Sequence, residues 1–166
     1  MIHAPRLRWL ILTFLVVFLD RVSKAAIEAK TFEGWRHELV RGFVYLVHSR
    51  NTGIAFSLFA DGSSWTRYIL ISGSALVIAI LAWYLVAGPL VSARAAAGLA
   101  LLLGGATGNL TDRILRGGVT DFFEVWFGPH RYPAFNVADS AITIGAILIL
   151  LDVLFPKRAA PKLPAK

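Results

Sequence analysis

The chain has 166 residues, of which 57% are hydrophobic and 16% are charged, and its formal net charge is +7. Soluble domains are typically about half apolar and about a quarter charged, so this composition excludes an ordinary soluble domain and predicts a polytopic membrane protein. The absence of cysteine excludes disulfide bonds and thiolate chemistry.

The polar side chains narrow the function classes further. Basic residues stand singly between apolar runs rather than in one stripe, which favours membrane flanks over a nucleic-acid surface. The four histidines form neither a helical pair nor an HExxH motif. We therefore expect no nucleic-acid partner and no zinc or iron site.

The first apolar run, residues 9–19, follows two arginines and so resembles a signal peptide. No small-residue cleavage site is evident and charges follow at once, which favours a retained helix over roughly residues 9–28. Because a span needs about 20 residues, this helix includes Asp20 and Lys24, at the favourable i,i+4 spacing. They are either an interfacial ion pair or, since a charge in the bilayer costs on the order of 3 kcal/mol, part of a functional polar interior.

Residues 30–66 form the most polar part of the chain. Residues 43–48 are rich in β-branched and aromatic side chains and predict a strand. Asn51 and Gly53 indicate a turn before a second short strand at 54–58. The pattern predicts a small sheet on the membrane surface, in which Asn51 serves the turn or a site.

Two further apolar runs predict helices over roughly residues 68–88 and 94–115, the first ended by Gly88-Pro89. Small residues such as Gly98 and Gly104 in the second predict close helix packing. Near its end, Asn109, Asp112 and Arg113 share one helical face.

The last part of the chain alternates polar and apolar segments. Gly117-Gly118 breaks the third helix, and residues 119–127 predict a strand or an interfacial segment. Gly128, Pro129 and Pro133 predict a loop, and a fourth helix follows over roughly 137–155. Residues 156–166 form a basic tail.

Charge bias sets the expected topology of a single integral membrane domain, residues 1–166. Both ends are basic, so by the positive-inside rule both lie in the cytoplasm, which requires an even number of spans, and four fit. The arginines at 36, 41 and 50 count against this rule. Residues 30–66 and 116–136 then form outer loops, and polar residues converge at the outer face. These residues are Asp20, Lys24, Asn51, Asn109, Asp112, Arg113, Asp121, Asn136 and Asp139.

The converging polar residues can perform acid/base chemistry through their carboxyl groups. A serine nucleophile lacks a histidine partner, whereas two aspartates that share a proton can activate water and protonate a carbonyl oxygen. The pair must come from Asp112, Asp121 and Asp139. Asp112 precedes Arg113 and is typical of an ion-paired scaffold acid, so we favour Asp121 with Asp139. Asp139 also fits a cap-like pair with Asn136, which is compatible with catalysis.

Five short motifs stand in order along the chain: DRVSK (20–24), NTGIAF (51–56), GNLTDR (108–113), VTDF (119–122) and FNVAD (135–139). With them the chain resembles the lipoprotein signal peptidases (signal peptidase II), bacterial membrane aspartyl proteases. The resemblance implies four transmembrane helices with a small extracytoplasmic sheet, and Asp121 and Asp139 as the catalytic pair. It implies supporting or substrate-binding roles for Asp20, Lys24, Asn51, Gly53, Asn109, Asp112, Arg113 and Asn136. Arg21 departs from the glutamine that is frequent in the family.

The resemblance also implies a reaction and a place. The substrate is a diacylglyceryl-modified prolipoprotein, cut before the modified cysteine at the outer face of the bacterial inner membrane. Membrane lipids are the other partners, no cofactor or metal is expected, and a monomer suffices. A small transporter or proton-conducting protein is the competing class, although its acids would lie near the midplane. A structural assembly subunit would leave the acids unexplained.

Overall fold

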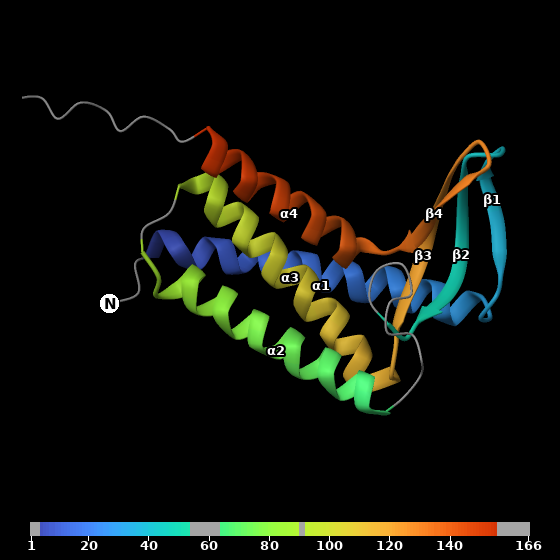
Figure 1. The fold of residues 1–166 in the computed structure, drawn as a ribbon, viewed down its shortest axis with the longest axis horizontal. Coiled ribbons are helices and arrows are strands. Elements are labelled where there is room, and N and C mark those ends of the chain that lie inside the picture. Colours follow the sequence, from blue (N-terminus) through green and yellow to red (C-terminus); the bar gives the residue numbers. More distant parts are fainter. Residues whose placement is uncertain (1–3, 54–63, 90–91, 156–166) are drawn as a thin grey trace, which may run out of the picture.

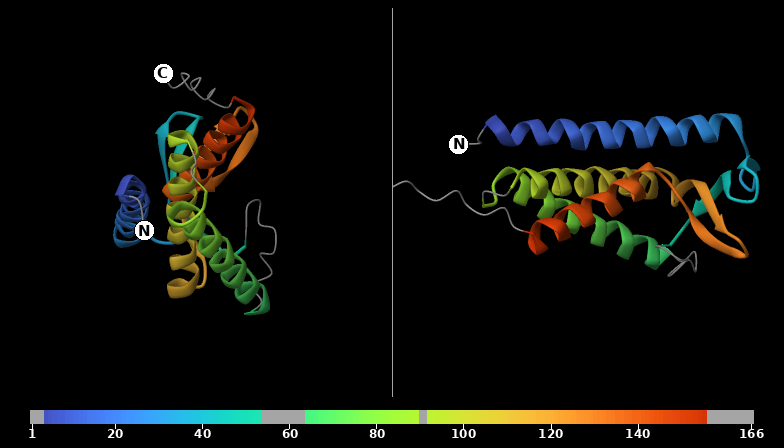
Figure 2. Two further views of the ribbon diagram at one scale, coloured as in Figure 1. Left: turned by 90° about the vertical axis from the view of Figure 1, so that its left-hand side faces the viewer. Right: turned by 90° about the horizontal axis from the view of Figure 1, so that it is seen from above.

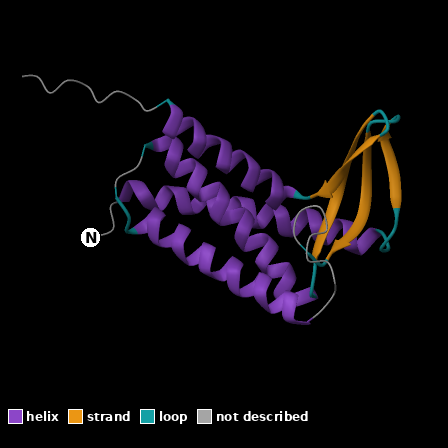
Figure 3. Ribbon diagram, in the orientation of Figure 1, coloured by secondary structure: helices purple, strands orange, loops and turns teal. Residues whose placement is uncertain are grey.

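The computed structural model describes residues 4–53, 64–89 and 92–155. In these ranges the chain forms four long helices and a four-stranded sheet at one end of the helical bundle (Figures 1 and 3). The helices are α1 (Ala4–Lys30), α2 (Ser64–Val86), α3 (Ala93–Arg116) and α4 (Val137–Leu154). The predicted ranges are confirmed within a few residues, although α1 begins at Ala4 rather than near residue 9. The predicted tail, 156–166, lies outside the described residues.

Two of the described helices are long and apolar enough to cross a membrane, Trp65–Val86 and Val137–Leu154. Their most apolar windows have mean hydropathies of 2.4 and 2.1 and are largely unburied within the protein, at 6% and 17% buried. Such exposed apolar surface suits contact with lipid. α1 and α3 carry charged residues within their length, and the count of four spans stays a prediction.

α3 is the central helix, with α1, α2 and α4 packed around it (Figure 2). Small residues make this packing close, as their spacing predicted. A Cβ atom added at Gly98 would lie 2.8 Å from the carbonyl oxygen of Gly145, and one added at Gly145 would lie 2.7 Å from that of Gly98. Since real Cβ atoms do not approach backbone so closely, α3 and α4 need glycine at this crossing.

The sheet joins two loops that are far apart in sequence. β1 (Arg36–Val40) and β2 (Val44–Asn51) come from the first predicted outer loop, and β3 (Val119–Phe127) and β4 (His130–Phe135) come from the other. The strands are antiparallel in the order β1-β2-β3-β4. The predicted sheet and two of its strands are confirmed, whereas the strand predicted at 54–58 lies outside the described residues.

The loop predicted from Gly128, Pro129 and Pro133 is confirmed only at Gly128 and Pro129, which form a turn. Its extension to Pro133 is wrong, because residues 130–135 form β4. Pro133 is tolerated because β4 is an edge strand, where a missing N–H need not break a ladder. The register of β3 and β4 also shifts near Pro133, between Phe123 and Val125. β1 was not predicted either.

Two helix ends place the strands against the bundle. Gly117 adopts a left-handed conformation (φ 78°) and its N–H donates to the carbonyl of Arg113, which ends α3 two residues before β3 begins. Asn136 caps the start of α4 directly after β4, with Asp139 completing a capping box. Asp121 and Asp139 therefore both lie at the junction of sheet and helices.

Candidate active site

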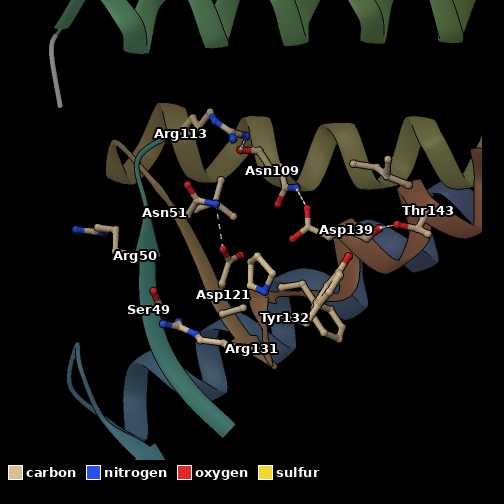
Figure 4. Close-up of a pocket in the computed structure, with 15 residues that line it drawn as sticks. Ser49, Arg50, Asn51, Asn109, Arg113, Asp121, Arg131, Tyr132, Asp139 and Thr143 are labelled. Atoms are coloured by element: carbon tan, nitrogen blue, oxygen red, sulfur yellow. Dashed lines mark hydrogen bonds between the residues drawn. The ribbon is translucent and has the colours of Figure 1, made fainter. Parts of the chain in front are cut away.

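A cavity of about 560 Å³ opens at this junction, lined by β2, β3 and β4 and by the ends of α3 and α4. Asp121 from β3 and Asp139 from α4 both line it, and Figure 4 shows their carboxyl groups pointing into the same space. Asp121 is 3% exposed. Asn109 and Arg113 of α3 and Asn51 of β2 complete the wall around the two acids.

Each oxygen of the Asp121 carboxyl group accepts one amide hydrogen bond. Nδ2 of Asn136 donates to Oδ1 at 2.7 Å, and Nδ2 of Asn51 donates to Oδ2 at 3.2 Å. Burial raises the pKa of Asp121 to about 7, the negative charge of Asp139 adds to the rise, and the two amides oppose it. Asp121 therefore holds a proton in part of the population at neutral pH.

Asp139 is held in the same way by α3 and by its own helix start. Nδ2 of Asn109 donates to its Oδ1 at 2.7 Å, and the backbone N–H of Asn136 donates to its Oδ2 at 3.2 Å. In return, the Asp139 N–H donates to Oδ1 of Asn136 at 2.9 Å. The predicted cap is confirmed, and Asn136 thereby contacts both acids.

Two hydrogen-bond donors fix the orientation of the Asn109 amide. Its Oδ1 accepts hydrogen bonds from Nζ of Lys24 at 3.1 Å and from Nδ2 of Asn136 at 3.2 Å. Because both neighbours are donors, the amide nitrogen of Asn109 must face Asp139. A network of side chains thus connects α1, α3, β3 and α4.

A buried ionic cluster supports this network. Asp20, Lys24 and Asp112 are all 0% exposed, and Nζ of Lys24 lies 2.7 Å from Oδ2 of Asp20 and 2.8 Å from Oδ2 of Asp112. Asp112 also pairs with Arg21 at 2.5 Å and with Arg116 at 3.1 Å. The predicted Asp20–Lys24 pair is confirmed. Asp112 is ion-paired as predicted, but the adjacent Arg113 is not its partner, because Arg21, Lys24 and Arg116 pair with it instead. Arg21, the departure from the family pattern, is part of the cluster.

The turn after β2 is tied to the cavity as well. Oδ1 of Asn51 accepts from the N–H of Gly53 at 3.0 Å, while its amide contacts Asp121, so Asn51 serves the turn and the site together. Arg113 donates to the carbonyl of Gly53 at 2.8 Å and interacts electrostatically with Asp139 and Asp121. All ten sequence-predicted site residues thus belong to one connected region.

Sequence reasoning missed several residues around the site. Arg131 of β4 lines the cavity and pairs with Glu124 of β3, and Thr120 donates to Glu28 of α1 at 2.7 Å. A lone glutamate within an aromatic strand was the available signal for Glu124. In the described part of the chain, no group of three or more potential metal ligands occurs.

Residues 12–155 match the family model described as signal peptidase (SPase) II. This chain belongs to the signal peptidase II family. The resemblance drawn from the five motifs is confirmed, and the family is one of membrane peptidases.

Relatives of this signal peptidase II chain cover nearly its whole length. It is 42% identical over 154 residues to the lipoprotein signal peptidase of Pseudomonas fluorescens, covering 92% of this chain and 91% of the relative. It is 37% identical over 162 residues to that of Xylella fastidiosa, covering 98% and 97%. A solved bacterial membrane enzyme shares its fold with a TM-score of 0.79 and 28% identity, over 93% of this chain and 94% of that one.

Proposed function

We propose that this chain is an endopeptidase that removes the signal peptide from diacylglyceryl-modified prolipoproteins, using Asp121 and Asp139 as an acid/base pair. The observation that carries the proposal is the convergence of these two acids in one cavity, where each carboxyl oxygen accepts a hydrogen bond. The relatives from Pseudomonas fluorescens and Xylella fastidiosa are named lipoprotein signal peptidases, which supports the choice of substrate class.

The environment of the two acids suggests their roles. Asp121 holds a proton near neutral pH because its burial and the neighbouring Asp139 charge raise its pKa. Protonated Asp121 donates to the carbonyl oxygen of the scissile bond. The Asp139 carboxylate takes a proton from the attacking water as the water oxygen bonds to the carbonyl carbon. Asp139 then gives this proton to the leaving nitrogen, the C–N bond breaks, and a hydroxyl of the tetrahedral intermediate returns its proton to Asp121.

The remaining polar residues hold this geometry. Asn51, Asn109 and Asn136 direct the carboxyl groups through their amides. Arg113, with its guanidinium at the cavity wall, orients the substrate backbone or holds the acids, and it also fixes Gly53. Asp20, Lys24 and Asp112 support Asn109 from the helices.

The proposal includes a place in the cell. Four spans with cytoplasmic termini would put the sheet and the cavity at the outer face of the bacterial inner membrane. The apolar helix faces would contact the signal helix and lipid chains there. Both acids come from one chain, so a monomer is sufficient for the reaction.

Cleavage by the purified protein in detergent tests the proposal. A diacylglyceryl-modified prolipoprotein is expected to be cut directly before the modified cysteine, while the same precursor without the lipid stays intact. Folded protein that cuts neither precursor would contradict the proposed function, and proton flux in reconstituted vesicles would then favour a transporter.

A further inference from the structure

A second cavity, of about 360 Å³, lies over the sheet next to the first. Ser49, Arg50 and Arg131 line both cavities, so these three residues form the boundary between them. Figure 4 shows Arg131 reaching from the wall of the first cavity toward Ser49 of β2. A chain bound at the two aspartates can therefore continue past Arg131 onto the sheet.

Glu124 organises this boundary, and the proposed acid/base chemistry does not use it. Its side chain is buried in β3, and its Oε1 lies 3.0 Å from a terminal nitrogen of Arg36 and 2.7 Å from Nε1 of Trp126. Its Oε2 lies 2.7 Å from Nε of Arg131. A buried carboxylate with these partners fixes the position of each of them.

Arg131 is bound in a way that leaves donors for another group. Glu124 contacts the Nε atom, and among the described residues the terminal nitrogens of the planar guanidinium have no hydrogen-bond or ion-pair partner, so they can bind a second group. The side chain is 53% exposed, at the rim of the cavity. Because Nε is paired with Glu124, the terminal nitrogens of Arg131 can donate hydrogen bonds to a carbonyl or carboxylate oxygen.

The chemistry of a prolipoprotein indicates which segment reaches this boundary. Its signal peptide and acyl chains are apolar and suit the helices, whereas the polypeptide after the modified cysteine is polar and leaves through water. Three arginines and two glutamates line the second cavity, which gives it an excess of positive charge. This excess favours an acidic side chain and disfavours a basic one.

Resting on the proposed function, we infer that Arg131 determines specificity by binding an acidic side chain in the first few residues after the cleaved bond. Glu124 acts through Arg131 as a positioning residue. The two cavities adjoin, and an extended chain advances about 3.3–3.6 Å per residue, so we choose the second to fourth residues after the cysteine as the positions to test.

The test compares three lipidated precursors that differ at these positions alone, with aspartate, asparagine or lysine, using the full chain in detergent. The wild type is expected to cleave the aspartate precursor with a kcat/KM about three- to tenfold above the asparagine one, and the lysine one least, as a partly exposed ion pair allows. The preference is expected to shrink when salt is raised from about 0.05 M to about 0.5 M.

Variants distinguish the effect of Arg131 on substrate preference from the effect of the total charge of the sheet. Arg131→Gln is expected to bring the three precursors within about twofold of one another, and Arg131→Lys to retain part of the preference. Glu124→Gln is expected to weaken the preference through the KM for the aspartate precursor. Arg41→Gln, an exposed change in the turn between β1 and β2, removes the same charge and is expected to keep the wild-type preference.

Three results would overturn the inference. The first two are equal cleavage of the three precursors by the wild type and an undiminished preference in folded Arg131→Gln. The third is loss of the preference in Arg41→Gln, because total charge would then be the cause. If the wild type cleaves no lipidated precursor, the proposed function fails instead, so the two failures are distinguishable.

Discussion

The ammonium group of Lys24 lies 3.1 Å from Oδ1 of Asn109, and this contact joins the buried ionic cluster to the two candidate catalytic acids. Asn109 in turn donates to Asp139 at 2.7 Å. A reversed Asn109 amide would bring its NH2 group against the Lys24 and Asn136 donors. Lys24 therefore has two roles, since it neutralises Asp20 and Asp112 and sets the direction in which Asn109 donates.

Lys24→Met tests the ionic cluster. Removing the ammonium leaves two buried carboxylates without their shared cation, and breaking a buried pair typically costs about 3–5 kcal/mol. We expect thermal unfolding in detergent at a clearly lower temperature, together with loss of cleavage. Lys30→Met on the same helix removes an exposed lysine and serves as the control. Equal unfolding temperatures for the two variants would contradict a supporting role for Lys24.

Gly108→Ala tests the contact between α3 and α1. A Cβ atom at position 108 would lie 2.6 Å from Oδ2 of Asp20, the oxygen that binds Lys24. Displacing a packed group in this way costs about 1–3 kcal/mol. Gly73→Ala in α2 is the matched control, because no atom lies within 4 Å of the added carbon. The control is expected to match or exceed wild-type stability, and a Gly108→Ala protein that did the same would refute the contact.

Asp121→Asn and Asp139→Asn test the candidate pair. Each substitution keeps the shape of the side chain and removes proton transfer, which typically contributes about 10²–10⁴-fold to a rate. We expect single-turnover cleavage of a lipidated precursor to fall by at least this factor, while circular dichroism shows wild-type helix content. Substantial residual cleavage by either variant would refute the assignment.

The pH dependence of cleavage follows from Asp121. A carboxyl group that must be protonated is fully active below its pKa and loses activity as the pH rises through it. With the pKa of Asp121 at about 7, kcat/KM is expected to fall about tenfold per pH unit on the alkaline side. A rate that stays constant from neutral pH to pH 9 in stable protein would rule out Asp121 as the acid.

Two substitutions at Asn136 distinguish its role as a helix cap from its role in supporting the two acids. Asn136→Ser keeps a side-chain oxygen that can cap α4 but loses the amide that donates to Asp121 at 2.7 Å. Asn136→Ala loses both and is expected to be less stable than the serine variant by about 1 kcal/mol. We expect both variants to cleave poorly, with the difference appearing in the unfolding temperature. Wild-type cleavage by Asn136→Ser would limit Asn136 to its capping role.

Local patterns predicted the parts of the site that depend on neighbours in sequence. The i,i+4 spacing gave the Asp20–Lys24 pair, and the asparagine three residues before Asp139 gave the capping box. Hydropathy gave the four helix ranges to within a few residues, apart from the start of α1. These features follow from helix geometry alone, so no tertiary information was needed.

The same local patterns could not predict contacts between residues that are far apart in the sequence. Asp112 contacts Arg21 and Lys24 because α1 and α3 pack side by side. The sequence pattern instead suggested Arg113 as its partner, because Arg113 is the adjacent residue. β4 was predicted as a loop because proline usually interrupts a strand, and its position at the sheet edge is a property of the whole fold. Glu124 and Arg131 meet through that same unpredicted strand pairing.

The two edge strands of the sheet affect whether the sheets of neighbouring molecules can pair. β1 carries Arg36, His37 and Glu38, and β4 carries Pro133, which has no N–H to offer a further strand. Charge and proline at sheet edges oppose strand addition from another chain. In a membrane, where proteins share one plane at high density, these edges disfavour aggregation through the sheet.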